Sequence, residues 1–151
     1  MKKLIILDDV FDASTVAKIA GFDYGEGEKW YELGANPIHE RILDLCARHF
    51  DLGAIVGYEM WRNSGNPGWH VDKDERLFRE RKEYRYPQCS AVYYADVGEV
   101  SGGEFFTDDL RYFPRTNRLV MFSPGLYHGV SAFSGRRFAV SLNPWNHRIT
   151  S

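Results

Sequence analysis

The chain has 151 residues, a length that suits one domain with a sizeable hydrophobic core. Hydrophobic residues make up 44 % and aromatic residues 15 %, which argues against disorder. The formal net charge of −2 gives no global field that would recruit nucleic acid or an anionic membrane. No run of the sequence approaches the ~18 apolar residues of a membrane span. Cys46 and Cys89 match no zinc spacing and are expected to be reduced and buried, which favours a cytoplasmic location.

The first twenty residues predict a short strand and a helix. Leu4 to Leu7 form an apolar run typical of a buried strand, and this run is too short for the core of a signal peptide. Asp12 or Ser14 can cap a following helix that extends to Ala20, and Gly21 would end it.

Residues 22–34 contain several glycines and predict a loop. Asn36-Pro37 is typical of a helix start, with an N-cap acceptor followed by proline at the first helical position. Apolar residues then recur at helical spacing up to Phe50. We therefore expect residues 1–53 to supply helical support.

From Ala54 the pattern changes to short strands separated by turns. Strands are expected near residues 54–61, 69–72, 88–95, 103–106, 117–122, 127–131 and 136–142. The connecting segment 73–88 is densely charged and predicts either a solvated helix or loop, or a lid over an active site. Two helices followed by many short strands predict a mainly β, α+β chain that forms a single domain over 1–151. Its β core would be a closed or sandwiched barrel over 54–146 with the N-terminal helices packed on one side.

One group of residues predicts a metal site. In a strand, residues i and i+2 point to the same face, so His70 and Asp72 would aim together into the barrel while Val71 points away. His128 would join them from another strand. Two imidazoles and one carboxylate are the ligand set of non-haem Fe(II) sites that leave one face of the metal open. Arg137, nine residues after His128, is suited to hold a carboxylate on that face.

Several motifs of residues 54–145 carry a resemblance to a known family. They are His70-Val71-Asp72, Ala91-Val92-Tyr93-Tyr94, Gly102-Gly103-Glu104-Phe105, Asn117-Arg118-Leu119-Val120-Met121-Phe122, His128-Gly129-Val130 and Gly135-Arg136-Arg137-Phe138-Ala139-Val140-Ser141. In order and spacing they resemble the 2-oxoglutarate and Fe(II)-dependent dioxygenase superfamily, in its prolyl-4-hydroxylase-like branch. The resemblance implies a double-stranded β-helix, or jelly-roll, barrel. It also implies Fe(II), 2-oxoglutarate as cosubstrate and dioxygen, with ascorbate as a candidate addition.

The resemblance further implies a role for each matching residue. His70, Asp72 and His128 would ligate the iron and form the catalytic centre. The cosubstrate would be held by Arg137 at its distal carboxylate with help from the Tyr94 hydroxyl, by apolar walls at Val130 and Leu119, and by Ser141 near the iron-bound end.

Strand alternation and turn chemistry refine these assignments. Only one of Arg136 and Arg137 can face the barrel interior, and the spacing from His128 favours Arg137. Tyr93 is then expected to pack on the face opposite to Tyr94. Asn117 stands where the family has a glycine, and asparagine tolerates the positive φ that such a turn requires.

The function implied by the resemblance is hydroxylation of an unactivated C–H bond. The best candidate substrate is a prolyl residue in a protein or peptide, and a free amino acid or another small molecule is the nearest alternative. Trp61, Arg62, Trp69 and Trp145 either line the substrate mouth or pack in the core and rim.

Three further functions compete. An AlkB-type nucleic-acid demethylase would carry a second arginine six residues after the first, where Asn143 stands, and the near-neutral charge also argues against a nucleic-acid partner. A cupin-type metalloprotein that does not use 2-oxoglutarate would share the ligands without needing Arg137 or Tyr94. A barrel that only binds a partner would need no ligand set. No membrane association and no particular oligomeric state are predicted.

Overall fold

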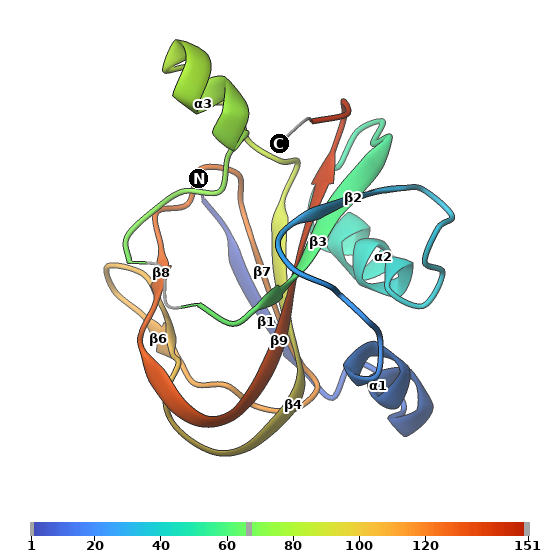
Figure 1. The fold of residues 1–151 in the computed structure, drawn as a ribbon, viewed down its shortest axis with the longest axis vertical. Coiled ribbons are helices and arrows are strands. Elements are labelled where there is room, and N and C mark those ends of the chain that lie inside the picture. The colour runs from blue at the N-terminus through green and yellow to red at the C-terminus, as the bar shows by residue number, and fades with distance from the viewer. Residues whose placement is uncertain (1, 66–67, 150–151) are drawn as a thin grey trace.

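The computed structural model describes residues 2–65 and 68–149, and in this part of the chain it has nine strands and three helices (Figure 1). The strands are β1 (Leu4–Asp8), β2 (Lys29–Glu32), β3 (Gly57–Asn63), β4 (Ser90–Gly102), β5 (Phe105–Phe106), β6 (Arg111–Tyr112), β7 (Arg118–Phe122), β8 (Gly129–Val130) and β9 (Phe133–Trp145). The helices are α1 (Ala13–Ala20), α2 (Glu40–His49) and α3 (Glu75–Arg81).

The strands form two antiparallel sheets. The larger has the order β1-β7-β4-β9-β3-β2, and the smaller has the order β6-β5-β8. The long strands β4 and β9 pair along most of their length and curve round one end of the molecule, as Figure 1 shows. This mainly β architecture confirms the predicted jelly roll with N-terminal helices. Within the described residues, no helix is long and apolar enough to cross a membrane.

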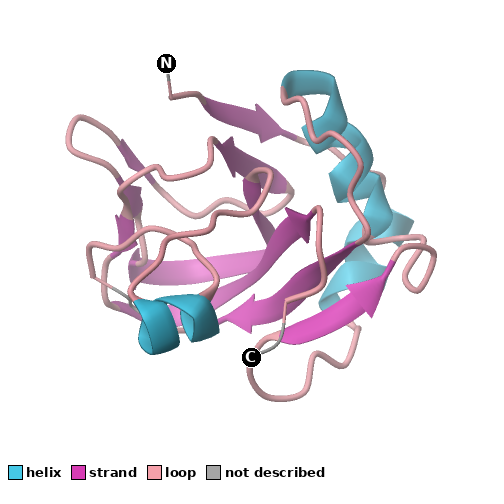
Figure 2. Cartoon of the chain, turned by 90° about the horizontal axis from the view of Figure 1, so that it is seen from above, coloured by secondary structure: helices cyan, strands magenta, loops and turns pink. Residues whose placement is uncertain are grey.

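Alternation along the strands gives the larger sheet two different apolar faces. On β4, Tyr93 packs in a core cluster that includes Ile19 of α1 and Ile42 of α2, as expected for its side of the strand. Tyr94, the next residue, lies in a second cluster with Phe122 on the inner face. Figure 2 shows α1 and α2 together on one side of the strands. Burying each large apolar side chain contributes roughly 1.5–3 kcal/mol to the stability of the fold. The helices therefore stabilise the sheet from its outer face, and its inner face remains available for a functional site.

The start of α1 confirms its predicted cap, whereas that of α2 does not. The Asp12 side chain accepts a hydrogen bond from the Thr15 backbone N–H. Helix α2 begins at Glu40, later than Asn36-Pro37 predicted, and its N-cap His39 makes no side-chain cap bond. The physical reason is that the Glu40 carboxylate accepts from the backbone N–H of Asn36, which holds residue 36 in a preceding turn.

Strand β2 lies inside the segment that was expected to be a loop, so that prediction is wrong for Lys29–Glu32. The aromatic residues Trp30 and Tyr31 favour an extended strand here, because Tyr31 stacks on Tyr58 of the paired strand β3 with ring centroids 5.7 Å apart. A four-residue strand flanked by glycines leaves too short a pattern to detect. The strand expected near 69–72 is reduced to one isolated bridge at His70.

The turn before β7 confirms the role expected of Asn117. Its φ is +66°, and its side chain bonds the backbone of Phe11 through both amide atoms. The Tyr93 hydroxyl also donates to Asn117 Oδ1 over 2.7 Å. This asparagine therefore replaces glycine in the turn and adds a link between the barrel and the α1 region.

Candidate metal centre

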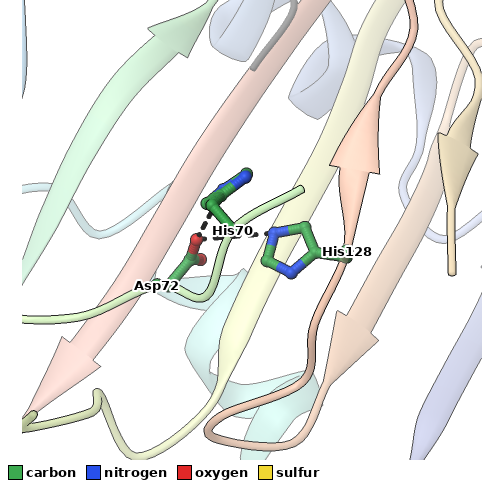
Figure 3. Close-up of side chains that lie close together, drawn as sticks. All are labelled: His70, Asp72 and His128. Carbon is green, nitrogen blue, oxygen red and sulfur yellow. Dashed lines mark ion pairs between the residues drawn. The ribbon is translucent and has the colours of Figure 1, made fainter. Parts of the chain in front are cut away.

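The three predicted ligands come together in the structure. Nε2 of His70 lies 3.3 Å from Oδ1 of Asp72, and Nε2 of His128 lies 3.4 Å from the same oxygen. One ligand atom from each residue can be chosen so that all lie within 4.8 Å of one another. Figure 3 shows the Asp72 carboxylate pointing to both imidazoles, which come from separate segments of the chain. In the part of the chain that the structure describes, no other group of three histidine, cysteine or acidic side chains converges in this way.

Each imidazole is held by its other nitrogen. His70 Nδ1 lies 2.8 Å from the Gly68 carbonyl oxygen, and His128 Nδ1 lies 2.7 Å from the Leu126 carbonyl oxygen. An Nδ1–H that donates to a carbonyl leaves Nε2 with a free lone pair, which is the form of histidine that binds a metal. Both Nε2 atoms face Asp72, so the two tautomers and the two orientations agree with one shared ion.

The backbone fixes the two histidines relative to each other. His70 N–H donates to the His128 carbonyl over 2.9 Å, and His128 N–H donates to the His70 carbonyl over 3.0 Å. The His128 ring also stacks on Phe105, with ring centroids 5.3 Å apart and planes at 19°, and contacts Phe122 at 4.5 Å. These apolar rings restrict the imidazole and keep its buried side dry.

The electrostatics of the triad favour an ionised carboxylate. Burial by itself would raise the pKa of Asp72, but in the metal-free site, where each imidazole can hold a second proton on Nε2, the interactions with His128 and His70 outweigh burial and hold that pKa well below the usual range. Burial would lower the pKa of His70, and here Asp72 outweighs burial, so the pKa of His70 is raised. An ionised carboxylate beside two imidazoles is a set of ligands that a divalent cation can bind, and its binding would displace the extra protons from the imidazoles.

A cavity of about 380 Å³ opens on the triad. Its apolar floor is formed by Val92, Phe105, Phe122 and Val130, and Ser141 and Asn143 of β9 line another side. Trp61 and Arg62 also line it, which agrees with one of the two roles considered for them. Trp145, in contrast, is fully buried in the core. The volume suits a small dicarboxylate together with part of a substrate.

Arg137 lies at the inner side of the barrel, and Arg136 faces solvent beside Asp96. Arg137 is only 4 % exposed, and its Nη1 donates to the Asn63 carbonyl over 2.8 Å. Within the described residues, its Nε and Nη2 atoms and the buried Tyr94 hydroxyl have no hydrogen-bond partner, and the guanidinium lies over the Tyr94 and Phe133 rings at 5.4 and 5.0 Å. Arg137 does not itself line the cavity that holds the triad, and Asn63 stands between the two.

Burial shifts both groups of this pair. It lowers the pKa of Arg137 and raises that of Tyr94, while each group partly offsets the shift of the other. The Nε–Nη2 edge of an arginine is the one that binds a carboxylate through two parallel hydrogen bonds. A buried edge of this kind without a partner therefore fits an anionic group.

The role expected of Leu119 is wrong. Leu119 packs in the cluster beneath the helices, on the face of the sheet opposite to Tyr94. Register explains this, because Leu119 pairs with Tyr93 and cross-strand partners share a face. Val120, the next residue, faces the interior instead. Val130 and Ser141 do line the cavity, as the sequence predicted.

Three polar residues of the cavity were missed by the sequence reasoning. Asn143 Nδ2 donates to Oδ2 of Asp72 over 3.4 Å, and Asn63 Nδ2 donates to Ser141 Oγ over 2.9 Å. Glu59 is 6 % exposed and accepts a hydrogen bond from Trp145 Nε1 over 2.9 Å. Strand parity was the available signal, since residue 143 shares a face with 137 and 141 on β9.

No protein-family model and no curated protein sequence matches the chain. Several solved structures are similar to it in fold. A viral collagen prolyl hydroxylase from Paramecium bursaria chlorella virus 1, in its 2OG complex, aligns with a TM-score of 0.64 and 11 % identity over 93 % of each chain. A Pseudomonas putida prolyl-4-hydroxylase aligns with a TM-score of 0.62 and 18 % identity, over 96 % of this chain and 93 % of that one.

A third structure is a Trichoplax adhaerens prolyl hydroxylase in complex with a peptide fragment of the hypoxia inducible factor oxygen degradation domain. It aligns with a TM-score of 0.56 and 15 % identity, over 95 % of this chain and 83 % of that one. The chain has the fold of the prolyl hydroxylases. At these identities the likeness is one of fold, and the chemistry follows from the residues described above.

The donor set fits a ferrous ion. Two imidazole nitrogens and one carboxylate oxygen lie within 4.8 Å of one another, and an ion held by three protein ligands would keep further coordination positions for small ligands from the cavity. His70, Asp72 and His128 are therefore the residues that would hold iron.

Proposed function

We propose that this protein is an Fe(II)- and 2-oxoglutarate-dependent dioxygenase that hydroxylates a C–H bond. One observation carries the proposal: the buried Nε–Nη2 edge of Arg137 and the Tyr94 hydroxyl lack partners in the same barrel that holds the triad. Buried N–H groups without a hydrogen-bond partner are costly, and a carboxylate from outside the chain would accept from both Nε and Nη2. A metal site that does not use 2-oxoglutarate gives no reason for this arrangement.

The residues then have separate tasks. Iron with 2-oxoglutarate supplies the oxidising chemistry when both are bound, converting the cosubstrate to succinate and carbon dioxide. His70, Asp72 and His128 hold the ion, and Arg137 with Tyr94 fixes the far carboxylate. Phe105, Phe122 and the other apolar residues of the floor exclude water from the reacting centre.

The substrate that we propose is a prolyl residue of a protein or peptide. Exposed aromatic rings lie beside both histidine ligands: Trp69, 44 % exposed, stacks on Tyr127 with centroids 4.9 Å apart and planes at 26°. Flat aromatic rims of this kind receive the apolar ring of proline in extended peptides. All three similar structures named above are prolyl hydroxylases, and one of them is bound to a peptide fragment, which supports a peptide over a free amino acid.

An anaerobic titration tests the proposal. Protein loaded with Fe(II) is titrated with 2-oxoglutarate while the metal-to-ligand charge-transfer band expected near ~500 nm is recorded. We expect a saturable band that is absent in His128→Ala. No band in a protein shown to hold iron would overturn the use of 2-oxoglutarate and favour the cupin-type alternative.

A further inference from the structure

Glu59 is a buried carboxyl group inside the cavity of the candidate metal centre. It lies on β3, directly opposite Asn143 of β9, so both side chains project from the same face of the sheet into the same space. Trp145 Nε1 donates to Glu59 Oε1. Among residues 2–65 and 68–149, no lysine, arginine or histidine forms an ion pair with Glu59. Carboxyl groups buried at this depth are normally paired with a cation or a metal.

A second observation points to a ligand at the same place. Asn143 is 3 % exposed, its Nδ2 is used by Asp72, and its Oδ1 is buried without a partner. Glu28 lines the same cavity, and its carboxyl group is near enough to raise the pKa of Glu59. The side-chain oxygens of this corner belong to two carboxyl groups and one amide, and all of them are acceptors once the carboxyl groups are ionised.

The basic side chains that line the cavity, Lys73 and Arg62, have other partners than these oxygens. Lys73 Nζ lies 3.2 Å from a carboxylate oxygen of Glu75, and the Arg62 guanidinium lies over the Phe138 ring at 4.2 Å. Burial, reinforced by Glu28, raises the pKa of Glu59 to about 8. Glu59 therefore holds its proton more tightly than an exposed glutamate does, and a bound cation would favour its ionised form.

We propose that Glu59, Asn143 and Glu28 form a subsite for a cationic nitrogen of the substrate, a protonated amine or a guanidinium. This inference rests on the proposed function and makes the substrate more specific. Because Asn143 contacts the metal-ligating Asp72, the cationic group lies close to the C–H bond that reacts. The preferred substrate is then a peptide in which a basic group adjoins the hydroxylated residue.

Four blocked peptides test this subsite: acetyl-Gly-Lys-Pro-Gly-amide, acetyl-Gly-Pro-Lys-Gly-amide, and the same two with norleucine in place of lysine. Norleucine retains the aliphatic chain and removes the charge. Binding is measured by calorimetry on protein loaded with Mn(II) and 2-oxoglutarate, so that no turnover occurs. We expect at least one lysyl peptide to bind roughly 10- to 100-fold more tightly than its norleucyl partner, the range of a charge-assisted hydrogen bond.

Two variants assign the preference to the subsite. In Glu59→Gln, which keeps the acceptor for Trp145, the ratio of the two affinities should fall to about 2 or less. Glu28→Gln changes an exposed residue at the mouth of the cavity, where the substitution should not affect folding. It should also reduce the ratio of the two affinities. Glu26→Gln removes the same charge from an exposed neighbouring position and should leave the ratio as in the parent.

The outcomes separate the two proposals. Mn(II) and 2-oxoglutarate binding are measured first, and their absence overturns the proposed function and this subsite together. If both bind but lysyl and norleucyl peptides bind equally, or no peptide binds up to about 10 mM, the subsite is wrong while the dioxygenase remains. A preference that survives both Glu59→Gln and Glu28→Gln also overturns it.

Discussion

Asn143 on β9 donates from Nδ2 to Oδ2 of Asp72, whereas both histidines face the other oxygen, Oδ1. The Asn143 amide thus orients the Asp72 carboxylate through Oδ2 and leaves Oδ1 available to bind the metal. Asp72 lies in a segment without regular secondary structure, so this contact and the histidines determine how its side chain is oriented.

Replacing this amide should weaken metal binding without removing a ligand. In Asn143→Ala we expect the affinity for Fe(II) or Mn(II) to fall by about 10- to 100-fold, the usual effect of losing a group that orients a ligand. Competition with a chromophoric chelator measures it. Asn146→Ala, at an exposed position on the same segment, is the control. Unchanged affinity in Asn143→Ala would mean that the 3.4 Å contact does not orient Asp72.

Removing a ligand should have a larger effect. His70→Ala and His128→Ala should abolish stoichiometric Fe(II) binding and turnover, because a two-ligand site cannot hold the ion against water and buffer. Asp72→Ala should abolish hydroxylation. Metal content after desalting and succinate formation are the measurements, with His49→Ala as a histidine control outside the site. Retained hydroxylation in Asp72→Ala would contradict the triad.

The adjacent arginines of β9 provide a matched pair. Arg137→Ala should raise the 2-oxoglutarate concentration for half-saturation by roughly 30- to 150-fold, since a charge-assisted bidentate pair contributes on the order of 2–3 kcal/mol. Arg136→Ala removes the same charge from the solvent face and should change little. Equal 2-oxoglutarate affinity in the parent and Arg137→Ala would refute the assignment.

Glu59 should make the metal-free protein less stable as the pH rises. Burial raises its folded-state pKa to about 8 from the ordinary value of 4.5, so the folded state holds this proton more tightly than the unfolded state. The associated stability is complete below pH 4.5 and is lost progressively up to about pH 8.

Urea unfolding at several pH values from 5 to about 8 tests this. The free energy of unfolding of Glu59→Gln, relative to the parent, should increase with pH by about 1 kcal/mol per unit. Glu99→Gln, at an exposed site, should run parallel to the parent. Parallel curves for Glu59→Gln would show that this carboxyl group does not titrate as described.

Helix α3 stands apart from the body of the molecule and has no buried residue, as a solvated helix would, and the alternative that it forms a lid over the active site can be tested. Asp74 N–H donates to the Arg85 carbonyl over 2.8 Å, so the segment leaves and returns at one point. Replacing residues 75–84 with a Gly-Gly link should preserve the fold and 2-oxoglutarate binding but raise the peptide KM by about tenfold or more. An unchanged KM in the folded variant would exclude a lid.

The sequence predicted the barrel, the ligand triad and the inward Arg137 because each depends on local alternation or on motif spacing. Leu119 shows where this fails: the motif placed it in the pocket, but the strand register turned it to the helices. Glu59 and Asn143 were missed because they become neighbours only through the pairing of β3 with β9. Strand β2 was missed because its partner, and not its own pattern, makes it a strand.

The reciprocal backbone bonds between His70 and His128 determine how the centre comes apart. His70 and Asp72 sit on one short segment, and this segment is joined to the barrel at the other histidine. When it detaches, two of the three ligands leave together, so the centre is lost in one step and does not weaken gradually. A bound ion resists that local opening, and amide exchange at His70 and His128 therefore reports metal occupancy while the core beneath the helices keeps its protection.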